Sequence, residues 1–370
     1  MANATKYAES RIDCISVSSC SIPTDFPESD GTLAWDKTII VIVEIKSGST
    51  SGIGYTYADL STATLIVTLL RGVLEGRDAM DIPGCWVAMT RAIRNLGRPG
   101  IASMALSAID IALWDLKAKL LQLPLSKLLG AVRLGIPIYG SGGFTSYSTD
   151  QLQHQLSGWV DSGIRMVKMK IGTYPERDIQ RVRDAREAIG NETRLFVDAN
   201  GAYTRKQALW FAHRFREFDV SWFEEPVSSE DLEGLHLIRD RVPEGMNIAA
   251  GEYGYCANYF RGMLDAEAVD ILQADATRCG GISGFLQASA LCDAQSVPLS
   301  AHTAPAVHMH ICCAVPKAIH LEYFHDHARI ENMLFDGVQQ PKSGELIPDL
   351  TRYGLGLEVR HDVREKYAAR

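Results

Sequence analysis

The sequence lacks the features that mark membrane, exported or nucleic-acid-binding proteins. It has no apolar run near the roughly 20 residues that a membrane-spanning helix requires, and segment 1–9 is polar rather than apolar, so we expect neither an anchor nor export. The 37 Lys and Arg residues are outnumbered by 45 Asp and Glu, and the net charge of −8 disfavours binding to nucleic acid or an anionic membrane. We therefore expect a cytoplasmic protein with neither kind of partner.

Paired cysteines and low-complexity segments are missing as well. None of the eight cysteines forms a CxxC motif, and Cys312 and Cys313 are adjacent within an apolar run. This usage predicts free thiols in the core of a cytosolic protein. A hydrophobic content of 46% and a charged content of 22% are typical of a globular protein, and 370 residues suffice for a barrel and a modest second domain.

A strand–helix rhythm occupies the middle of the chain. Eight short, mostly apolar segments recur there, and most of them are separated by an amphipathic, helix-like stretch. Repeats of roughly 25 residues of this kind are typical of a parallel (β/α) barrel. The predicted strands are Ile136–Gly140, Arg165–Lys170, Leu195–Asp198, Trp222–Glu224, Ile248–Glu252, Ile271–Asp275, Leu299–His302 and Ile319–Glu322.

All of these segments except the first end on a charged residue. In such a barrel the carboxyl ends of the strands meet at one mouth, so residues far apart in sequence converge on one pocket. Burying ammonium groups, carboxylates and an imidazole together is costly unless they have a purpose, and the pattern therefore indicates an enzyme. The terminal residues are Lys168 and Lys170, Asp198, Glu224, Glu252, Asp275, His302 and Glu322.

Residues 1–130 do not follow this rhythm. Three predicted strands are followed by three predicted helices, which indicates a small α+β capping domain ahead of a catalytic barrel at 131–330. Residues 331–370 contain turn signals and a short predicted strand, and we expect them to pack back on the capping domain. The predicted strands are Ile12–Ser19, Thr38–Ile45, Gly52–Ala58 and, in the tail, Leu355–Val359; the helices are Leu60–Leu74, Cys85–Leu96 and Ala102–Leu121.

A polar stretch in the first domain, Ser19–Gly31, contains Pro23 and Pro27 and is predicted to be a loop. Two interpretations are open. It is either a surface loop beside the strand tyrosines Tyr55 and Tyr57, or a lid over the barrel mouth that keeps water from the pocket. The barrel prediction favours the lid.

Three carboxylates, Asp198, Glu224 and Glu252, end successive predicted strands. Like charges held this close repel one another unless a cation lies among them, and hard oxygen ligands suit Mg²⁺. Within the Glu224–Glu225 pair we assign Glu224 as the ligand and Glu225 as its neighbour. A salt-bridged strand end is the ordinary explanation for any one of these acids, but a weak one for three in succession.

Two lysines share one face of a predicted strand. Alternation along Lys168-Met169-Lys170 points both ammonium groups into the barrel and Met169 away from it. A buried ammonium beside a second one and beside Mg²⁺ would have a lowered pKa, as a general base at neutral pH requires. Lys168 could meanwhile stabilise negative charge on a substrate oxygen. The ordinary alternative is a pair of solvated charges.

Asp275, His302 and Glu322 end the last three predicted strands. An imidazole oriented by a carboxylate is a general acid or base, here on the opposite wall from the lysines. Glu322 could donate a hydrogen bond to an oxyanion if it is kept protonated. A strand-end acid that is paired with a nearby base is the alternative for Glu322.

As a set, these motifs resemble the enolase superfamily and, within it, the mandelate racemase subgroup. One departure is Tyr253, which follows the third acid where many relatives carry Asn and which bears on substrate contacts rather than on the metal. The motifs are Lys168-Met169-Lys170, Val197-Asp198-Ala199-Asn200, Trp222-Phe223-Glu224-Glu225-Pro226, Ala250-Gly251-Glu252, Asp275 followed by Gly280-Gly281, Ser300-Ala301-His302, Leu321-Glu322 and the helical run Ile109-Asp110-Ile111-Ala112-Leu113-Trp114-Asp115.

The resemblance implies an α/β fold, a (β/α)7β modified TIM barrel whose N-terminal α+β capping domain is completed by the C-terminal tail. It also implies a homo-oligomer, and Mg²⁺ held by Asp198, Glu224 and Glu252. The catalytic groups it implies are Lys170 as one base, Lys168 beside the substrate carboxylate, the His302–Asp275 dyad as the opposite base or acid, and Glu322 as electrophile.

A site of this kind removes the proton next to a carboxylate and stabilises the resulting enediolate. We expect dehydration of a sugar acid, an aldonate or aldarate, to a 2-keto-3-deoxy acid, because subgroup members with both bases most often resemble acid-sugar dehydratases. A racemase, epimerase or cycloisomerase is the alternative, and a carboxylate-binding protein without catalysis is a more distant one. The candidate substrate contacts are Tyr55, Tyr139, Ser141 and Asn200.

Overall fold

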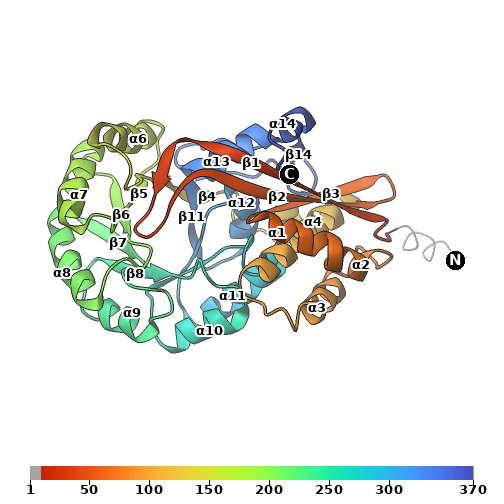
Figure 1. The fold of residues 1–370 in the computed structure, drawn as a ribbon, viewed down its shortest axis with the longest axis horizontal. Helices are drawn as coiled ribbons and strands as arrows, with labels where there is room; N and C mark the ends of the chain where they lie inside the picture. The colour runs from red at the N-terminus through yellow and green to blue at the C-terminus, as the bar shows by residue number, and fades with distance from the viewer. Residues whose placement is uncertain (1–9, 370) are drawn as a thin grey trace.

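Eight parallel strands close into a barrel in the computed structural model, which describes residues 10–369 (Figure 1). Each strand pairs with its neighbours in chain order, and the last strand also pairs with the first. The strands are β4 (Ile136–Gly142), β5 (Met166–Lys170), β6 (Arg194–Asp198), β7 (Val220–Glu224), β8 (Asn247–Ala250), β9 (Ile271–Ala274), β10 (Leu299–Ala301) and β11 (Ala318–Phe324).

Seven α-helices connect successive barrel strands and surround them, and an eighth follows β11 (Figure 1). This arrangement confirms the predicted (β/α)7β barrel. The helices are α6 (Thr149–Asp161), α7 (Pro175–Ile189), α8 (Arg205–Phe215) with the 3-10 turn η2 (Arg216–Phe218), α9 (Leu232–Arg239), α10 (Ala257–Asp265), α11 (Gly281–Gln295), α12 (Pro305–Ala314) and α13 (His325–Leu334).

An aromatic cluster fills the barrel interior. Tyr139, Phe196 and Trp222 point inward from β4, β6 and β7 and pack together, with the rings of Phe196 and Trp222 stacked at 5.2 Å. The Lys168 ammonium lies 5.5 Å from the Tyr139 ring, so the charged groups rest directly on this aromatic layer. Charged groups would be costly to place within this apolar layer, so they lie above it at the mouth of the barrel.

Three of the predicted site residues lie just beyond their strands. Asp275 directly follows β9, His302 directly follows β10, and Glu252 lies two residues past the end of β8. Gly251, between the end of β8 and Glu252, has a φ of 138°, and a Cβ at this position would lie 2.1 Å from the Gln273 carbonyl oxygen. Only glycine fits this close approach, which carries Glu252 back to the mouth.

The capping domain is a three-stranded antiparallel sheet packed on helices. Its longest helix, α4, lies against β3 and β2, and the apolar side chains between the helices and the sheet form a core separate from that of the barrel. The elements are β1 (Cys14–Ser29), β2 (Ala34–Ser47), β3 (Thr50–Tyr57), α1 (Leu60–Leu65), the π-helical turn η1 (Ile66–Leu70), α2 (Arg71–Leu74), α3 (Ile82–Ala92), α4 (Ile101–Leu120) and α5 (Leu125–Leu128).

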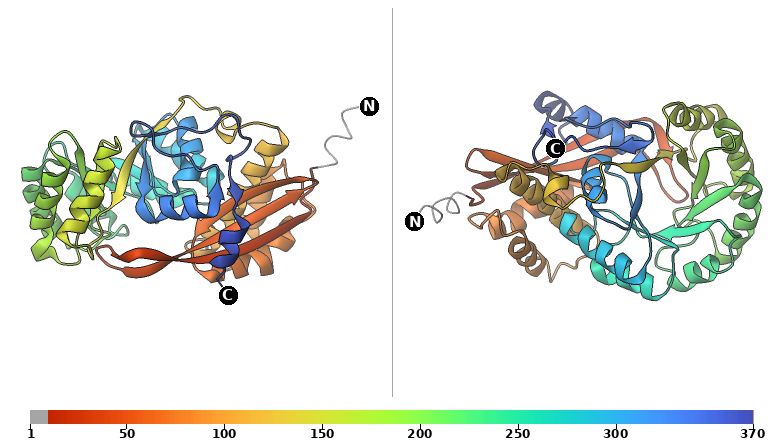
Figure 2. Two further views of the ribbon diagram at one scale, coloured as in Figure 1. Left: turned by 90° about the horizontal axis from the view of Figure 1, so that it is seen from above. Right: turned by 180° about the vertical axis from the view of Figure 1, so that it is seen from behind.

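Residues 19–29 of the segment predicted as a loop, Ser19–Gly31, instead belong to strand β1, so the prediction is wrong for this part, and only residues 30–31 lie outside the strand. Its prolines are tolerated because β1 is an edge strand, and a register shift between Pro23 and Glu28 absorbs the irregularity. The β1–β2 hairpin reaches over one end of the barrel (Figures 1 and 2). Its tip is held there by hydrogen bonds from Thr145 N to Ser29 O at 2.8 Å and between the two side-chain hydroxyls at 2.6 Å.

Helix α4 joins the capping domain to the barrel through buried polar side chains. The Ser107 hydroxyl accepts hydrogen bonds from Gly280 N and Gly281 N at 2.8 and 3.1 Å, and Asp110 accepts one from Ser283 N at 2.9 Å. These donors begin helix α11, whose first amides have no partner within their own helix. A side chain from another domain therefore caps a barrel helix.

The C-terminal segment returns to the capping domain. Asp115 on α4 accepts hydrogen bonds from Ile53 N and Leu355 N at 2.7 and 2.6 Å, which joins β3 to the tail. Arg364 forms an ion pair of 2.7 Å with Glu44 on β2. The tail contains β12 (Phe335–Asp336), β13 (Glu345–Leu346), which adds to β4 of the barrel, β14 (Glu358–Val359), which pairs with β12, and α14 (His361–Lys366).

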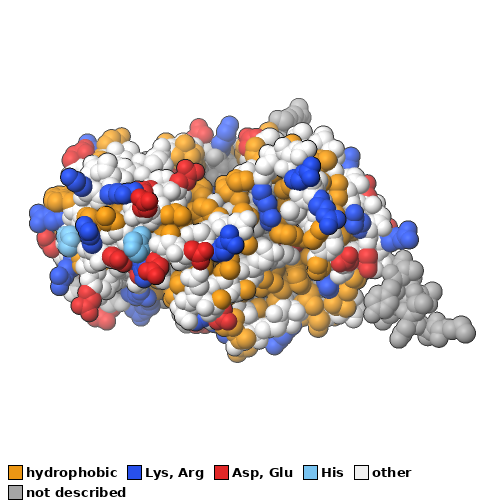
Figure 3. Space-filling model, turned by 90° about the horizontal axis from the view of Figure 1, so that it is seen from below, with side chains coloured by type: hydrophobic (Ala, Val, Ile, Leu, Met, Phe, Trp, Pro, Cys, Tyr) orange, Lys and Arg blue, Asp and Glu red, His pale blue; other side chains and the backbone are white. Residues whose placement is uncertain are grey.

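The surface differs between the two parts of the molecule. On the face in Figure 3 the barrel end carries charges of both signs, whereas apolar side chains gather toward the capping domain, whose helices expose Val67 and Val87. Among residues 10–369, no helix is both long and apolar enough to span a bilayer. All eight cysteines are free.

The close contact between α4 and α11 leads us to a prediction about stability. Gly281→Ala places a Cβ 2.2 Å from Asp110 Oδ2 at a φ of 81°, and we expect it to lower the free energy of unfolding by about 2 kcal/mol or more. Gly262→Ala in α10 meets no atom within 4 Å and should leave stability unchanged or raise it by up to about 1 kcal/mol. Urea unfolding followed by circular dichroism tests this, and equal effects of the two changes would contradict it.

Candidate active site

A cavity of about 560 Å³ lies between the barrel mouth and the capping domain. The barrel supplies most of the charged side chains that line it, and the β1–β2 hairpin and the end of β3 form the opposite wall. Lys170, Asn200, Glu252, His302 and Glu322 come from the barrel, and Leu33, Trp35, Lys37 and Tyr57 come from the capping domain.

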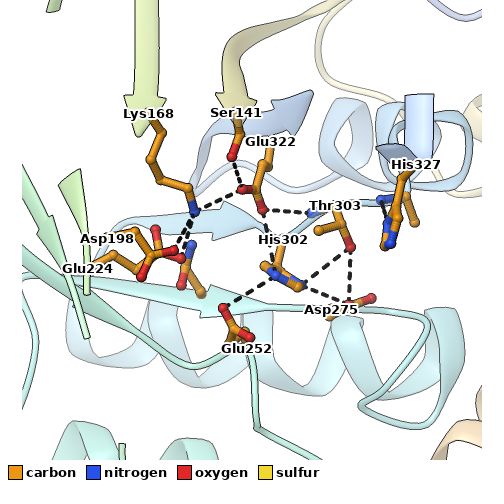
Figure 4. Close-up of polar contacts among 12 residues, drawn as sticks. Ser141, Lys168, Asp198, Glu224, Glu252, Asp275, His302, Thr303, Glu322 and His327 are labelled. Atoms are coloured by element: carbon orange, nitrogen blue, oxygen red, sulfur yellow. Dashed lines mark hydrogen bonds and ion pairs between the residues drawn. The ribbon is translucent and has the colours of Figure 1, made fainter. Parts of the chain in front are cut away.

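Asp198, Glu224 and Glu252 are buried and lie side by side, and one oxygen from each falls within 4.8 Å of the other two (Figure 4). Burial and the charge of Asp198 raise the pKa of Glu224 to about 8, which is the electrostatic cost of bringing these acids together. Among the described residues, Glu252 Oε2 accepts no hydrogen bond. An all-oxygen set with an unused buried acceptor fits a hard divalent cation such as Mg²⁺.

The charge balance of the site points the same way. Besides the His302 imidazole, five buried acidic side chains face three cations, and a divalent ion bound among the acids would offset this excess of acids. The carboxylates are Asp198, Glu224, Glu252, Asp275 and Glu322, and the cations are Lys168, Lys170 and Arg278.

Both strand lysines point into this group of acids. Lys168 Nζ lies 2.7 Å from Glu224 Oε1 and 2.8 Å from Glu322 Oε1, and Lys170 Nζ lies 2.5 Å from Asp198 Oδ2. Burial alone would lower the pKa of Lys170, but the charge of Asp198 outweighs burial and holds this pKa above its ordinary value. Each ammonium is compensated by a carboxylate in contact with it, and the lowering of the pKa that is predicted beside bound Mg²⁺ stays a prediction.

His302 and Asp275 form the predicted dyad. His302 Nδ1 lies 2.9 Å from Asp275 Oδ2, which leaves Nε2 directed toward Glu252 Oε2 at 3.4 Å (Figure 4). Burial opposes the imidazolium, but Glu252, Glu322 and the hydrogen bond to Asp275 raise the pKa of His302 above its ordinary value. This is the environment of a basic imidazole.

Glu322 accepts every hydrogen bond that it makes. Its Oε1 receives the Ser141 hydroxyl at 2.5 Å as well as Lys168, and its Oε2 receives Thr303 N at 3.1 Å. Burial favours the neutral acid, but Lys168 and His302 lower the pKa of Glu322 well below its ordinary value. These contacts favour the carboxylate form of Glu322, whereas the predicted role as a hydrogen-bond donor requires the protonated form.

Two of the four candidate substrate contacts lie at the site. Ser141 touches Glu322, and Asn200 lines the cavity, with its backbone N–H donated to Asp198 at 2.9 Å. Tyr139 belongs to the aromatic floor, and Tyr55 is fully buried with its hydroxyl on Glu331 at 2.6 Å. Neither of these two tyrosines lines the cavity. Tyr57, two residues along β3 and nearer its end, does so instead.

Two further cavity residues escaped prediction. Arg278 bridges Glu252 and Asp275, with its Nη1 3.1 Å from the first and its Nε 3.6 Å from the second. Its position three residues after Asp275, in the turn before Gly280-Gly281, is a signal that could have found it. His327 lines the cavity from α13. It lies after the last barrel strand, where the strand-end rule gives no guidance.

Two protein-family models match the sequence. The N-terminal domain model of mandelate racemase / muconate lactonizing enzyme covers residues 21–130. The model described as enolase C-terminal domain-like covers residues 151–363, which is more than half of the chain.

Several known proteins are similar over nearly the full length. An L-talarate/galactarate dehydratase from Salmonella typhimurium is 33% identical, covering 98% of this chain and 93% of its own, and its crystal structure with Mg and L-lyxarohydroxamate matches with a TM-score of 0.89. A 3,6-anhydro-alpha-L-galactonate cycloisomerase from Streptomyces coelicolor is 32% identical over 81% of this chain and 84% of its own. A mandelate racemase/muconate lactonizing enzyme-like protein from Rubrobacter xylanophilus is 55% identical, with a TM-score of 0.95 over 97% of this chain and 100% of that one.

Adjacent glutamates allow a matched test of the metal site. Glu224→Gln removes a carboxylate of the triad, and we expect Mg²⁺ affinity to fall by more than about 100-fold, beyond the loss typical for an outer-shell partner. Glu225 is also buried but does not belong to the triad, so Glu225→Gln should change affinity only a few-fold.

Isothermal titration of EDTA-treated protein with Mg²⁺ measures both variants, and the thermal shift caused by Mg²⁺ provides a second readout. Equal losses in the two variants, or a wild-type protein that does not respond to Mg²⁺, would contradict the assignment of the triad.

Proposed function

Since the chain belongs to the mandelate racemase/muconate lactonizing enzyme family of the enolase superfamily, we propose that it is a Mg²⁺-dependent acid-sugar dehydratase. It removes the proton next to the carboxylate of an aldonate or aldarate and expels the hydroxyl of the neighbouring carbon as water. The product is a 2-keto-3-deoxy acid. The observation that carries the proposal is the buried triad of acids flanked by Lys170 on one side and the His302–Asp275 dyad on the other.

The chemical difficulty is the weak acidity of a proton beside a carboxylate. Its removal places a second negative charge on the carboxylate oxygens, so a catalyst has to hold positive charge there in advance. Asp198, Glu224 and Glu252 would hold Mg²⁺, which supplies much of this charge when it is bound. Lys168, buried between Glu224 and Glu322, supplies a fixed ammonium on the same side.

Two groups can move protons in the cavity. Lys170 and His302 both line it and come from separate parts of the barrel, β5 and the end of β10, so they can reach different faces of one substrate. One of them takes the α-proton and the electron pair passes into the enediolate. The other donates a proton to the departing hydroxyl as its carbon–oxygen bond breaks, and the same electron pair forms the new carbon–carbon double bond. Asp275 orients His302 for this exchange.

Arg278 links the two halves of this machinery as a positioning residue. Its guanidinium contacts both Glu252 of the triad and Asp275 of the dyad, and it is itself largely buried. Ser141 and Thr303 hold Glu322 beside Lys168. We assign Asn200 as a substrate contact because its Oδ1 is buried without a hydrogen-bond partner in the described chain, although the residue lines the cavity.

A cycloisomerase or racemase is the second candidate. The same enediolate expels an intramolecular leaving group when the substrate is a lactone or anhydro sugar, and the similarity to the Streptomyces coelicolor cycloisomerase favours this option. A carboxylate-binding protein without catalysis is less well supported, because every acid and base of the set is present. We also propose that the protein acts in the cytoplasm, where its free thiols remain reduced, and as a homo-oligomer.

Screening a library of mono- and diacid sugars for keto-acid formation tests the function. We expect Lys170→Ala and His302→Asn each to abolish product formation, and one of them to retain exchange of the α-proton with solvent deuterium, because the remaining base still reaches one face. Nuclear magnetic resonance measures both readouts, and His154→Asn, on the exposed side of α6, is the control.

Full turnover by either site variant would remove that residue from the mechanism. If the wild-type protein with Mg²⁺ exchanges the α-proton of no acid in the library, the binding-protein alternative gains.

A further inference from the structure

Besides His302, a second histidine lines the cavity and has no part in the proton transfers above. His327 belongs to the first turn of α13, is only 8% exposed, and lines the cavity together with residues of the capping domain. Figure 4 shows it beside the loop that carries His302 and Thr303. Buried polar groups normally have hydrogen-bond partners, and a buried imidazole that opens onto a substrate cavity can find one in the substrate.

The plane of the His327 ring is fixed by aromatic neighbours. The ring of Tyr57, at the end of β3, stacks on it with centroids 3.4 Å apart and an angle of 10°. Phe324 meets it edge-on at 5.0 Å, and the Tyr57 hydroxyl donates to the His327 carbonyl oxygen at 3.3 Å. Because Tyr57 comes from the capping domain and Phe324 from β11, both parts of the molecule fix the orientation of this ring.

The hydrogen bonds distinguish the two ring nitrogens. Ala304 N donates to His327 Nδ1 at 3.5 Å, so Nδ1 carries the lone pair and, in a neutral ring, Nε2 carries the proton. Burial and the positive charge of His302 lower the pKa of His327 well below its ordinary value, which keeps the ring neutral. No described residue forms a hydrogen bond or ion pair with Nε2, which leaves this N–H to the cavity.

We propose that His327 is a specificity residue whose Nε2–H donates a hydrogen bond to a hydroxyl oxygen of the sugar acid, away from the reacting carbons. This inference rests on the proposed function and states what the site selects, a polyhydroxy acid over its deoxy analogue. His327 is not a third base, since Nδ1 is engaged with Ala304 and Nε2 already holds a proton. A buried donor left without a partner disfavours the analogue that lacks this hydroxyl.

Two amide substitutions separate hydrogen bonding from packing. His327→Gln extends an amide to the position of Nε2 and should retain most of the selectivity. His327→Asn can replace Nδ1 toward Ala304 but is too short to replace Nε2, and should lose selectivity. His327→Phe keeps a ring against Tyr57 and removes both nitrogens. His154→Phe, on the exposed face of α6, controls for the general effect of a His-to-Phe change.

The experiment compares kcat/KM for the best sugar acid of the library and for its monodeoxy analogues. We expect the wild-type protein and His327→Gln to prefer the parent acid over one particular analogue by about tenfold or more. His327→Asn and His327→Phe should bring that ratio near one, through a raised KM for the parent acid and with kcat less affected. Circular dichroism establishes that each variant is folded.

A ratio in folded His327→Asn equal to that of the wild-type protein would overturn the inference and leave the dehydratase proposal standing. Loss of activity on parent and analogue alike in both amide variants would also overturn it, because that pattern indicates packing alone. A wild-type protein that acts on no sugar acid would instead refute the proposed function, and this inference with it.

Discussion

The structure depends on balancing charges that have been removed from water. Lys168 and Lys170 reach the barrel mouth from one strand, and each is in contact with a carboxylate contributed by another strand. A buried aromatic layer lies beneath them, so an uncompensated charge of either sign would be costly there. The acids outnumber the cations, and that excess creates a site for a divalent metal ion. The electrostatics that would stabilise an enediolate are therefore built into the ground state of the fold.

Much of this arrangement could be predicted from the sequence because one geometric rule connects the two. Parallel barrel strands end at a common mouth, so the residues that close eight apolar segments had to converge, and the triad of Asp198, Glu224 and Glu252 followed. The rule gives no information about segments that return to the mouth from elsewhere. Arg278 in a turn and His327 on a helix reach the cavity by such routes, and neither was predicted.

Other predictions failed where local signals compete with tertiary context. Prolines in Ser19–Gly31 indicated a loop, yet an edge strand accommodates them. Tyr55 was chosen over Tyr57, although a separation of two residues on one strand decides between a buried hydroxyl and a cavity wall. The direction in which the protein's own groups shift the pKa of Lys170 and of Glu322 could not be predicted from the sequence either. Sequence order shows which charges are neighbours but not which of them touch, and contacts below 3 Å determine the direction of the pKa.

The polar contacts of α4 bear on how such enzymes can be recombined. One family model ends at residue 130 and the other begins at residue 151, which suggests that the capping and barrel portions could be exchanged independently. Yet Ser107 and Asp110 complete a helix of the barrel, and Asp115 secures the returning tail. A chimera that takes one portion from a relative would keep this helix cap only if the relative supplies equivalents of Ser107 and Asp110, and would keep the contact with the tail only if it supplies an equivalent of Asp115. The two portions of this protein are therefore structurally matched across this junction, and recombination that ignores it would leave polar groups of α11 and of the tail without their partners.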